Sequence, residues 1–261
     1  MARVLVVGGT GLAGRAIAAE AVERGHDVVV ASRRVPDDDS TAYVPGAVYA
    51  TVDLITGDGL EEAVEGMDVL IDASNGVGRE ASHTFIAGSQ NLLHTAARFG
   101  VGHAVLLSIA NVDRSAYSYY RAKAAQERTY HDSPIETRIV RTTQFHDFLA
   151  SIFASGARIG VIPAFTKVHF QTIAVPDVAR ILVDAAEGGG PPNATRTVGG
   201  PRIQSSRALA EAWKAATGSR AVIAGVRQPG ALGASWRAGD NLAPDQAIEG
   251  IDFEKWLSAT V

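Results

Sequence analysis

Short runs of apolar residues alternate with longer amphipathic segments along the first half of the chain. The apolar runs are rich in β-branched residues and nearly continuous, as expected of strands that are covered on both faces. These runs occupy residues 3–7, 27–31, 47–52, 69–73, 103–107 and 136–141. The longer, alanine-rich segments between them include 12–24, 82–99 and 117–131. The alternation predicts repeated strand-helix-strand units around a doubly wound parallel sheet.

The alternation of apolar and amphipathic segments becomes less regular after residue 141. Two glycine-rich breaks follow at 188–192 and 199–201. Between the second break and residue 218 the pattern predicts a helix over 205–217, with Ser205 or Ser206 as its N-cap and Gly218 at its C-terminal end. We expect this half to complete the sheet and to form a small α/β lobe.

Composition narrows the range of partners. A chain of 261 residues that is 46% hydrophobic can bury a large core, and one domain is the default. The net charge of -4 provides no basic field for nucleic acid or an anionic membrane, so a small molecule is the expected partner. The chain has no cysteine, no signal-peptide pattern and no long apolar stretch. We therefore expect a cytoplasmic protein without a membrane partner, either a monomer or a homodimer.

A glycine-rich turn joins the first predicted strand to the first predicted helix. Its residues are Gly8, Gly9, Thr10, Gly11, Leu12, Ala13 and Gly14. Glycines at such a turn allow a sharp reversal and let a pyrophosphate approach the backbone at the helix N-terminus. A merely structural turn is the alternative, but the strand-turn-helix context favours a dinucleotide site. The prediction is a Rossmann-type single domain, with a cofactor-binding core over 1–150 and sheet completion and a substrate lobe over 151–261.

The end of the second predicted strand indicates which dinucleotide binds. An NAD site usually presents an acid to the ribose there, whereas an NADP site presents arginine to the 2′-phosphate. In this chain Ser32, Arg33 and Arg34 follow that strand. Because the guanidinium fork suits phosphate, NADP(H) is the expected cofactor, with solvated loop charges as the alternative reading.

Polar residues at the ends of the next two strands are further cofactor candidates. Asp53 and Leu54 could flank the adenine, although an aspartate at a strand end is as often a cap or a turn former. Ser74 and Asn75 follow the fourth strand, where the chain would line the crevice at the topological switch point.

A tyrosine and a lysine four residues apart suggest hydride chemistry. Tyr119 and Lys123 follow the fifth strand on a predicted helix, where positions i and i+4 share one face. Such a lysine could hold the nicotinamide ribose and, with the charge of the cofactor, lower the pKa of the tyrosine. Ser108, at the end of the fifth strand, could orient a carbonyl or hydroxyl substrate. A chance occurrence of the spacing is the alternative.

The segment after the sixth strand is the candidate substrate region. Gln144, Phe145 and His146 lie there, and His146 could donate to a substrate oxygen or shuttle a proton. Alternatively, His146 caps or packs beneath the following helix. The seven histidines show no metal-binding spacing, so no metal site is expected.

The chain resembles the atypical short-chain dehydrogenase/reductase superfamily, specifically its NmrA-like branch of NAD(P)H-binding proteins. The resemblance rests on the glycine turn, residues 32–34, Ser108, and the segments 119–124, 141–148 and 253–257. It implies a Rossmann fold with a C-terminal substrate lobe and a lysine near the nicotinamide, at Lys123. Many members of this branch lack the tyrosine and some act as redox sensors, so the presence of Tyr119 favours catalysis.

Together these features favour an NADPH-dependent oxidoreductase that transfers hydride to a small or medium carbonyl, quinone or enone. Tyr119 would donate the proton, Lys123 would hold the ribose and Ser108 would assist. A non-catalytic NADP(H)-sensing regulator with a protein partner is the first alternative. An epimerase or dehydratase that retains its cofactor is the second, and it is disfavoured because nothing in the sequence suggests a sugar-nucleotide site.

Overall fold

The chain divides into two compact units, each made of three segments. The computed structural model describes residues 1–76 and 80–260. Unit 1 comprises Met1–Ser108, Arg121–Val140 and Val178–Arg196, and unit 2 comprises Ile109–Tyr120, Arg141–Asp177 and Thr197–Val261. The expected cofactor-binding core over 1–150 and substrate lobe over 151–261 remain a prediction. The chain leaves unit 1 after Ser108 and returns to it twice, over Arg121–Val140 and Val178–Arg196.

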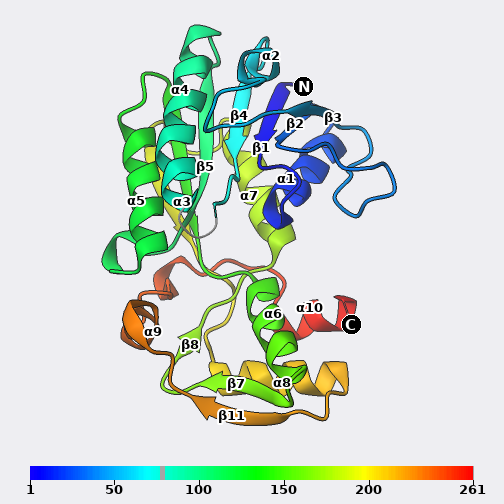
Figure 1. Ribbon diagram of the computed structural model, residues 1–261, viewed down its shortest axis with the longest axis vertical. Coiled ribbons are helices and arrows are strands. Elements are labelled where there is room, and N and C mark those ends of the chain that lie inside the picture. The colour runs from blue at the N-terminus through cyan, green and yellow to red at the C-terminus, as the bar shows by residue number, and fades with distance from the viewer. Residues whose placement is uncertain (77–79, 261) are drawn as a thin grey trace. The chain divides into compact units, whose positions relative to one another are not determined.

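A seven-stranded sheet in the order β3-β2-β1-β4-β5-β6-β9 organises unit 1. Its strands β1 to β5 are labelled in Figure 1. Its strands are β1 (Arg3–Val7), β2 (Asp27–Ser32), β3 (Val48–Thr51), β4 (Val69–Asp72), β5 (His103–Ile109), β6 (Glu136–Thr142) and β9 (Ala194–Val198). The pairs from β3 through to β5 are parallel. All six predicted strands are present, and the strand order reverses between β1 and β4, which is the Rossmann switch point.

Helices pack on this sheet because strands such as β1, β4 and β5 bury apolar side chains on both faces. They are α1 (Leu12–Glu23), α2 (Leu60–Val64), α3 (Glu80–His83), α4 (Ser89–Arg98), α5 (Ser118–His131) and α7 (Val175–Ala186). A π-helical turn, η1 (Thr84–Gly88), lies between α3 and α4, so the helix expected over 82–99 is divided. One buried cluster includes Leu5, Leu70, Leu92 and Leu106 and joins strands to helices.

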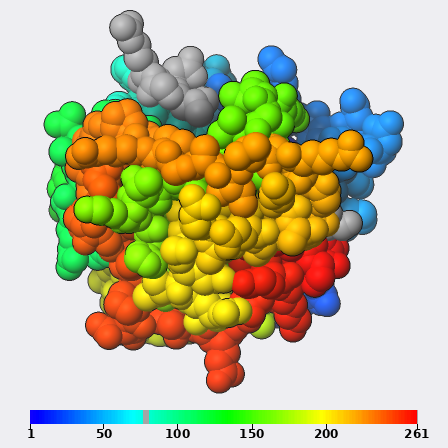
Figure 2. Space-filling view, turned by 90° about the horizontal axis from the view of Figure 1, so that it is seen from below, coloured from blue at the N-terminus to red at the C-terminus, as the bar shows by residue number. Residues whose placement is uncertain are grey.

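Unit 2 is a small α/β assembly. Strand β7 (Val161–Phe165) pairs in parallel with β11 (Val222–Val226), and β8 (His169–Phe170) pairs antiparallel with β10 (Gln204–Ser205). Its helices are α6 (His146–Ala157), α8 (Ser206–Thr217), α9 (Gly230–Ala238) and α10 (Phe253–Thr260), with short 3-10 turns η2 (Val112–Arg114) and η3 (Pro244–Gln246). The C-terminal segments, yellow to red, cover much of the face seen in Figure 2.

The ends of α8 follow their sequence signals. Ser205 is the N-cap, and its side chain accepts a hydrogen bond of 3.1 Å from the backbone N–H of Ala208. Gly218 ends the helix in the left-handed region at φ +64°. Across the described residues, no helix is both long and apolar enough to cross a membrane.

Candidate cofactor and catalytic site

The glycine turn is closed by short backbone contacts within unit 1. Gly8 has φ +71°, which glycine adopts readily, and its N–H donates to the carbonyl oxygen of Ala31 at 3.0 Å. A Cβ at Gly8 would lie 2.8 Å from the carbonyl oxygen of Ala73. A Cβ at Gly14 would lie 2.2 Å from the carbonyl oxygen of Gly8. The turn therefore needs glycine at both positions, and side chains there would fill the cradle.

The N-terminus of α1 is suited to a phosphate group. Gly11 is its N-cap, and no side chain of the described residues caps the helix there. The first turn carries no acidic residue, so the positive end of the helix dipole is not neutralised locally. Backbone N–H groups and this dipole together favour an anion, and the described geometry fits a pyrophosphate.

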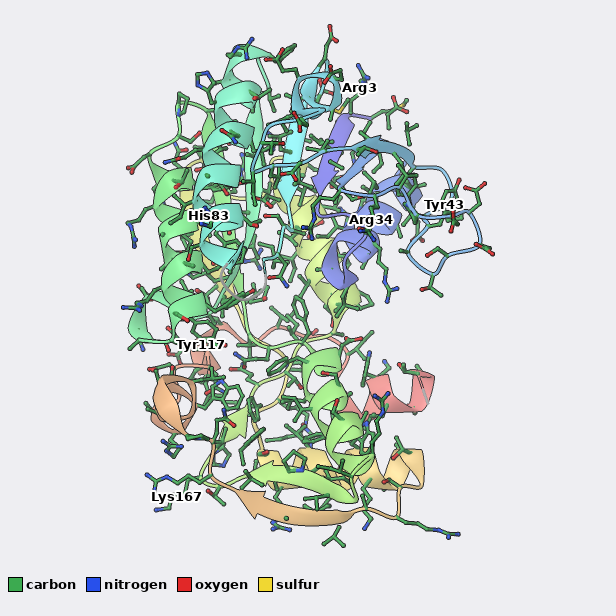
Figure 3. All side chains as sticks on the ribbon, viewed as in Figure 1. Arg3, Arg34, Tyr43, His83, Tyr117 and Lys167 are labelled. Atoms are coloured by element: carbon green, nitrogen blue, oxygen red, sulfur yellow. The ribbon has the colours of Figure 1, made fainter. Side chains whose placement is uncertain are left out.

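The loop after β2 carries the predicted 2′-phosphate residues. Ser32 is buried, and its hydroxyl donates to the carbonyl oxygen of Arg34 at 2.5 Å, which folds the loop back on itself. Arg33 and Arg34 are exposed, and Arg34 is labelled in Figure 3. Two guanidinium groups are thus presented to solvent immediately beyond the strand that neighbours β1.

Asp53 and Leu54 form a local turn after β3. One carboxylate oxygen of Asp53 accepts hydrogen bonds from the backbone N–H groups of Ile55 at 2.8 Å and Thr56 at 3.3 Å. Leu54 is half-buried, and its carbonyl accepts from the side chain of Asn91. These contacts support the turn-forming role for Asp53 that the sequence left open.

Ser74 lies directly beside the glycine turn. A Cβ at Gly8 would be 2.9 Å from the Cα of Ser74, so the two loops touch at the switch point. The Ser74 side chain is buried, and its hydroxyl oxygen has no hydrogen-bond partner among the described residues. Asn75 next to it is exposed. The switch-point loop therefore presents an unsatisfied hydroxyl next to the phosphate cradle.

Ser108 and Lys123 are both buried in unit 1. Ser108 lies in β5, the strand beside β4, and is 2% exposed. Lys123 on α5 is 5% exposed, and its Nζ lies 4.7 Å from the centroid of the Phe85 ring in η1. Burial lowers the pKa of Lys123 to about 8, while the charges of Asp72 and Glu127 act in the opposite direction.

Tyr119 lies in the first turn of α5, within a cluster of three tyrosines in unit 2. Its ring centroid lies 6.3 Å from that of Tyr117, which is labelled in Figure 3, and 6.1 Å from that of Tyr120. Burial, with smaller effects of these neighbours, raises the pKa of Tyr119 to about 12. The phenol is therefore protonated at neutral pH, and its pKa is shifted in the direction opposite to the lowering that the sequence predicted for it beside Lys123 and a bound cofactor.

His146 and Phe145 lie at the start of α6 in unit 2. The Nε2 atom of His146 lies 2.8 Å from the carbonyl oxygen of Ile251, and Nδ1 lies 2.7 Å from the hydroxyl of Thr172. Because a carbonyl only accepts, Nε2 carries the proton and Nδ1 accepts from Thr172. Burial lowers the pKa of His146. Both ring nitrogens are thus used within unit 2, which supports the packing alternative for this residue.

Gln144, a predicted substrate-region residue, lies beside an aromatic region that includes Tyr120 and Trp236. Tyr120 lies beside the side chains of Gln144 and Trp236, and burial raises the pKa of its phenol while these two groups lower it. The ring of Trp236 lies 5.2 Å from each of Phe165 and Phe170. The side-chain oxygen of Gln144 and the indole nitrogen of Trp236 are both buried.

Side chains that commonly bind metal ions are scattered in the part of the chain that the structure describes. No group of three or more His, Asp or Glu side chains there could hold a metal ion. The described site residues are instead a phosphate cradle, exposed arginines and a tyrosine and lysine on one helix.

Together, the sheet order and the glycine cradle define a Rossmann-type dinucleotide-binding protein. Residues 8–188 match the model of a family described as NAD(P)H-binding. The chain belongs to this family, and the match begins at Gly8 and includes the segment with Lys123. The expected nicotinamide-dinucleotide class of cofactor is thereby confirmed.

Two proteins with similar sequences can be compared with this chain over part of their length. Divinyl chlorophyllide a 8-vinyl-reductase, chloroplastic, of Arabidopsis thaliana is 26% identical, with 76% of this chain and 53% of that protein covered. An uncharacterized protein of Mycobacterium tuberculosis is 30% identical over 112 residues, which cover 43% of this chain and 12% of that protein. The chain thus spans about half of the length of the Arabidopsis relative and a smaller share of the mycobacterial one. A cytoplasmic location remains a prediction.

Solved structures with the same fold include epimerases and a reductase. A nucleoside-diphosphate-sugar epimerase from Staphylococcus aureus has a TM-score of 0.77 at 18% identity, covering 98% of this chain and 99% of that chain. An NADPH-dependent quinone oxidoreductase from Escherichia coli has a TM-score of 0.74 at 15% identity, covering 98% of each chain. These similarities confirm the Rossmann-type α/β fold.

Proposed function

We propose that this protein is an NADPH-dependent oxidoreductase that reduces a small or medium carbonyl, quinone or enone. The observation that carries the proposal is the placement of Tyr119 four residues before Lys123 on the one helix α5. The E. coli structural neighbour is named as an NADPH-dependent quinone oxidoreductase and the Arabidopsis relative as a reductase, which supports this reaction class.

The proposed roles follow from the groups that each residue carries. Bound NADPH would supply the hydride. The phenol of Tyr119 donates its proton to the substrate oxygen as the hydride reaches carbon, and the phenolate regains a proton from solvent. The ammonium group of Lys123 donates hydrogen bonds to the ribose, and the hydroxyl of Ser108 orients the substrate oxygen. The backbone N–H groups at the start of α1 bind the pyrophosphate.

The choice of NADPH over NADH rests on the loop after β2. Arg33 and Arg34 are exposed there, and a guanidinium group binds a phosphate dianion through paired, charge-assisted hydrogen bonds. The carboxylate of Asp53, in contrast, is occupied by the backbone of its own turn. The arginines therefore favour a cofactor that carries a 2′-phosphate.

A substrate panel with a tyrosine variant tests the proposal. NADPH oxidation is measured with quinones, enones, aldehydes and ketones. We expect at least one class to be turned over, and Tyr119→Phe to lower that turnover by about 10²- to 10⁴-fold, because it removes the acid and leaves the ring. NADPH affinity, measured by fluorescence titration, should be unchanged. Tyr117→Phe is the matched control, since it removes an exposed phenol of the same cluster.

The contrary outcomes separate the other functions. Full turnover in Tyr119→Phe would show that this phenol is not the proton donor. Absence of turnover across the panel, with a protein partner whose binding differs between NADP⁺ and NADPH, would establish a regulator instead. Conversion of UDP-glucose without net oxidation of the cofactor would establish an epimerase, the class of several fold neighbours.

A further inference from the structure

The buried face of α5 in unit 1 is polar where an apolar seam is expected. Lys123, Gln126, Glu127 and Tyr130 follow the spacing i, i+3, i+4 and i+7, which places them on one side of the helix. They are 5%, 0%, 3% and 0% exposed, respectively. Burying two ionisable groups and an amide along one helix face is costly unless each finds a partner. The arrangement therefore points to a role beyond packing.

Asp72 connects this face to the cofactor cradle. It is fully buried at the end of β4, where one carboxylate oxygen accepts from the backbone N–H of Ser74 at 2.8 Å. The other oxygen accepts from the amide of Gln126 at 3.0 Å and from the hydroxyl of Tyr130 at 2.7 Å. Three donors thus fix the carboxylate between the switch-point loop and α5.

The network reaches a third element through Gln126. Its amide nitrogen also donates to the hydroxyl of Ser89 on α4, at 2.8 Å. The ends of β4, α4 and α5 are therefore held together by polar contacts. Because the loop of Ser74 touches Gly8, the same network supports the wall of the phosphate cradle.

Lys123 occupies the end of this polar face. Its Nζ lies over the ring of Phe85, which makes a cation-π contact. The ring carries no negative charge that could pair with the ammonium group. The charged groups that act on it are Asp72, from β4, and Glu127, one helical turn along α5. Removal of either carboxylate would take away one of the two negative charges that offset the desolvation of the buried ammonium group.

We propose that Asp72 and Glu127 are positioning residues that keep the buried Lys123 ammonium group charged and in place. This inference rests on the proposed function in assigning that ammonium group to the cofactor ribose. Asp72 has the additional task of coupling α5 to the switch-point loop, so that the lysine and the cradle keep one relative arrangement.

Direct titration of the lysine tests the inference without measuring activity. The chain has four lysines, so NMR of protein labelled with [ε-¹³C]lysine resolves each one, and Lys123→Met identifies the buried signal. We expect a midpoint near pH 8 for Lys123 in the wild type. Asp72→Asn and Glu127→Gln should each lower this midpoint, by about one pH unit or more, because each removes an opposite charge.

Tyr130→Phe is the matched control for a merely structural role. It deletes a hydrogen bond to Asp72 and leaves the carboxylate charge in place, so the Lys123 midpoint should stay close to that of the wild type. Should Asp72→Asn not fold, Glu127→Gln alone decides. An unchanged midpoint in the folded carboxylate variants, or an equal shift in Tyr130→Phe, would overturn the inference.

Cofactor titration separates this inference from the proposed function. NADPH affinity at pH 7 should be lower in Lys123→Met than in the wild type. As the pH is raised, Lys123 loses its proton and NADPH affinity should decrease. In Glu127→Gln this decrease should occur at a lower pH than in the wild type. If Lys123→Met bound NADPH as tightly as the wild type, the ribose-binding role in the proposed function would be wrong. The NMR midpoints would still decide whether Asp72 and Glu127 hold the lysine in its charged form.

Discussion

At the scale of single residues, the proposed choice of NADPH rests on two arginines. Arg33 and Arg34 follow β2 and are exposed, so we expect them to contribute little to stability. Their effect should appear in binding and not in folding. This separation makes them suitable for a clean test of specificity.

Arg33→Ala should weaken NADPH binding by about 10- to 100-fold and leave NADH binding unchanged. The expected loss corresponds to one or two charge-assisted hydrogen bonds to the 2′-phosphate. Fluorescence titration with each cofactor measures both affinities, and Arg34→Ala shows how the two arginines share the contact. Arg207→Ala, at an exposed arginine of α8, is the control. Equal losses for NADPH and NADH would contradict the assignment.

At the scale of elements, backbone geometry explains which glycines matter. Gly8 and Gly25 both have positive φ, at +71° and +80°. A Cβ at Gly8 meets the carbonyl oxygen of Ala73 at 2.8 Å, whereas a Cβ at Gly25 meets none of the described atoms within 4 Å. The pair therefore separates backbone strain from crowding between β1 and the switch-point loop.

Gly25→Ala should cost about 1–2 kcal/mol in the free energy of unfolding, which is the price of a left-handed alanine. Gly8→Ala should cost more and should also weaken NADPH binding by at least about tenfold, because the cradle must open to accept the methyl group. Urea unfolding and cofactor titration measure the two effects. If Gly8→Ala lost no more stability than Gly25→Ala and still bound NADPH as tightly as the wild type, the contact with Ala73 would be unimportant.

The predicted elements differ most from the structure between α3 and α4. The alanine-rich pattern over 82–99 predicts one helix, but η1 inserts a π-helical turn there. Phe85 lies in that turn and faces Lys123. An insertion of this kind shifts the helical register without changing composition, so periodicity over a window of this length does not reveal it.

At the scale of the whole molecule, buried histidines make stability depend on pH. His146 joins α6 to the segment before α10 and also contacts the rings of Phe253 and Trp256, at 5.5 and 5.6 Å. Burial lowers its pKa from an ordinary value of 6.5. The folded protein therefore binds fewer protons than the unfolded chain below about pH 6.5, and stability is lost as the pH falls.

Acidification from pH 7.5 to 5.5 should lower the free energy of unfolding of unit 2, with a slope of up to about 1.4 kcal/mol per pH unit from His146. Tryptophan fluorescence reports this unit, because Trp213, Trp236 and Trp256 all belong to it. In His146→Gln, stability at pH 7.5 should fall and the pH slope should become smaller. His103, whose pKa burial also lowers, lies in unit 1 and remains unchanged as an internal reference. An unaltered slope would place the pH dependence elsewhere.

Local sequence determined six of the seven strands of the large sheet, the glycine turn and the arginines after β2, because alternation, glycine spacing and strand ends are properties of neighbouring residues. The caps of α8 at Ser205 and Gly218 followed for the same reason. The strand β9 was not predicted. Tertiary structure alone decided which polar residues meet. Asp72 joins Gln126 and Tyr130 across more than 50 positions of sequence, and His146 joins Ile251 across 105. The division into two units of three segments each also depends on which distant segments pack together. The burial of a side chain and its hydrogen-bond partners are set by the fold and not by the local sequence pattern.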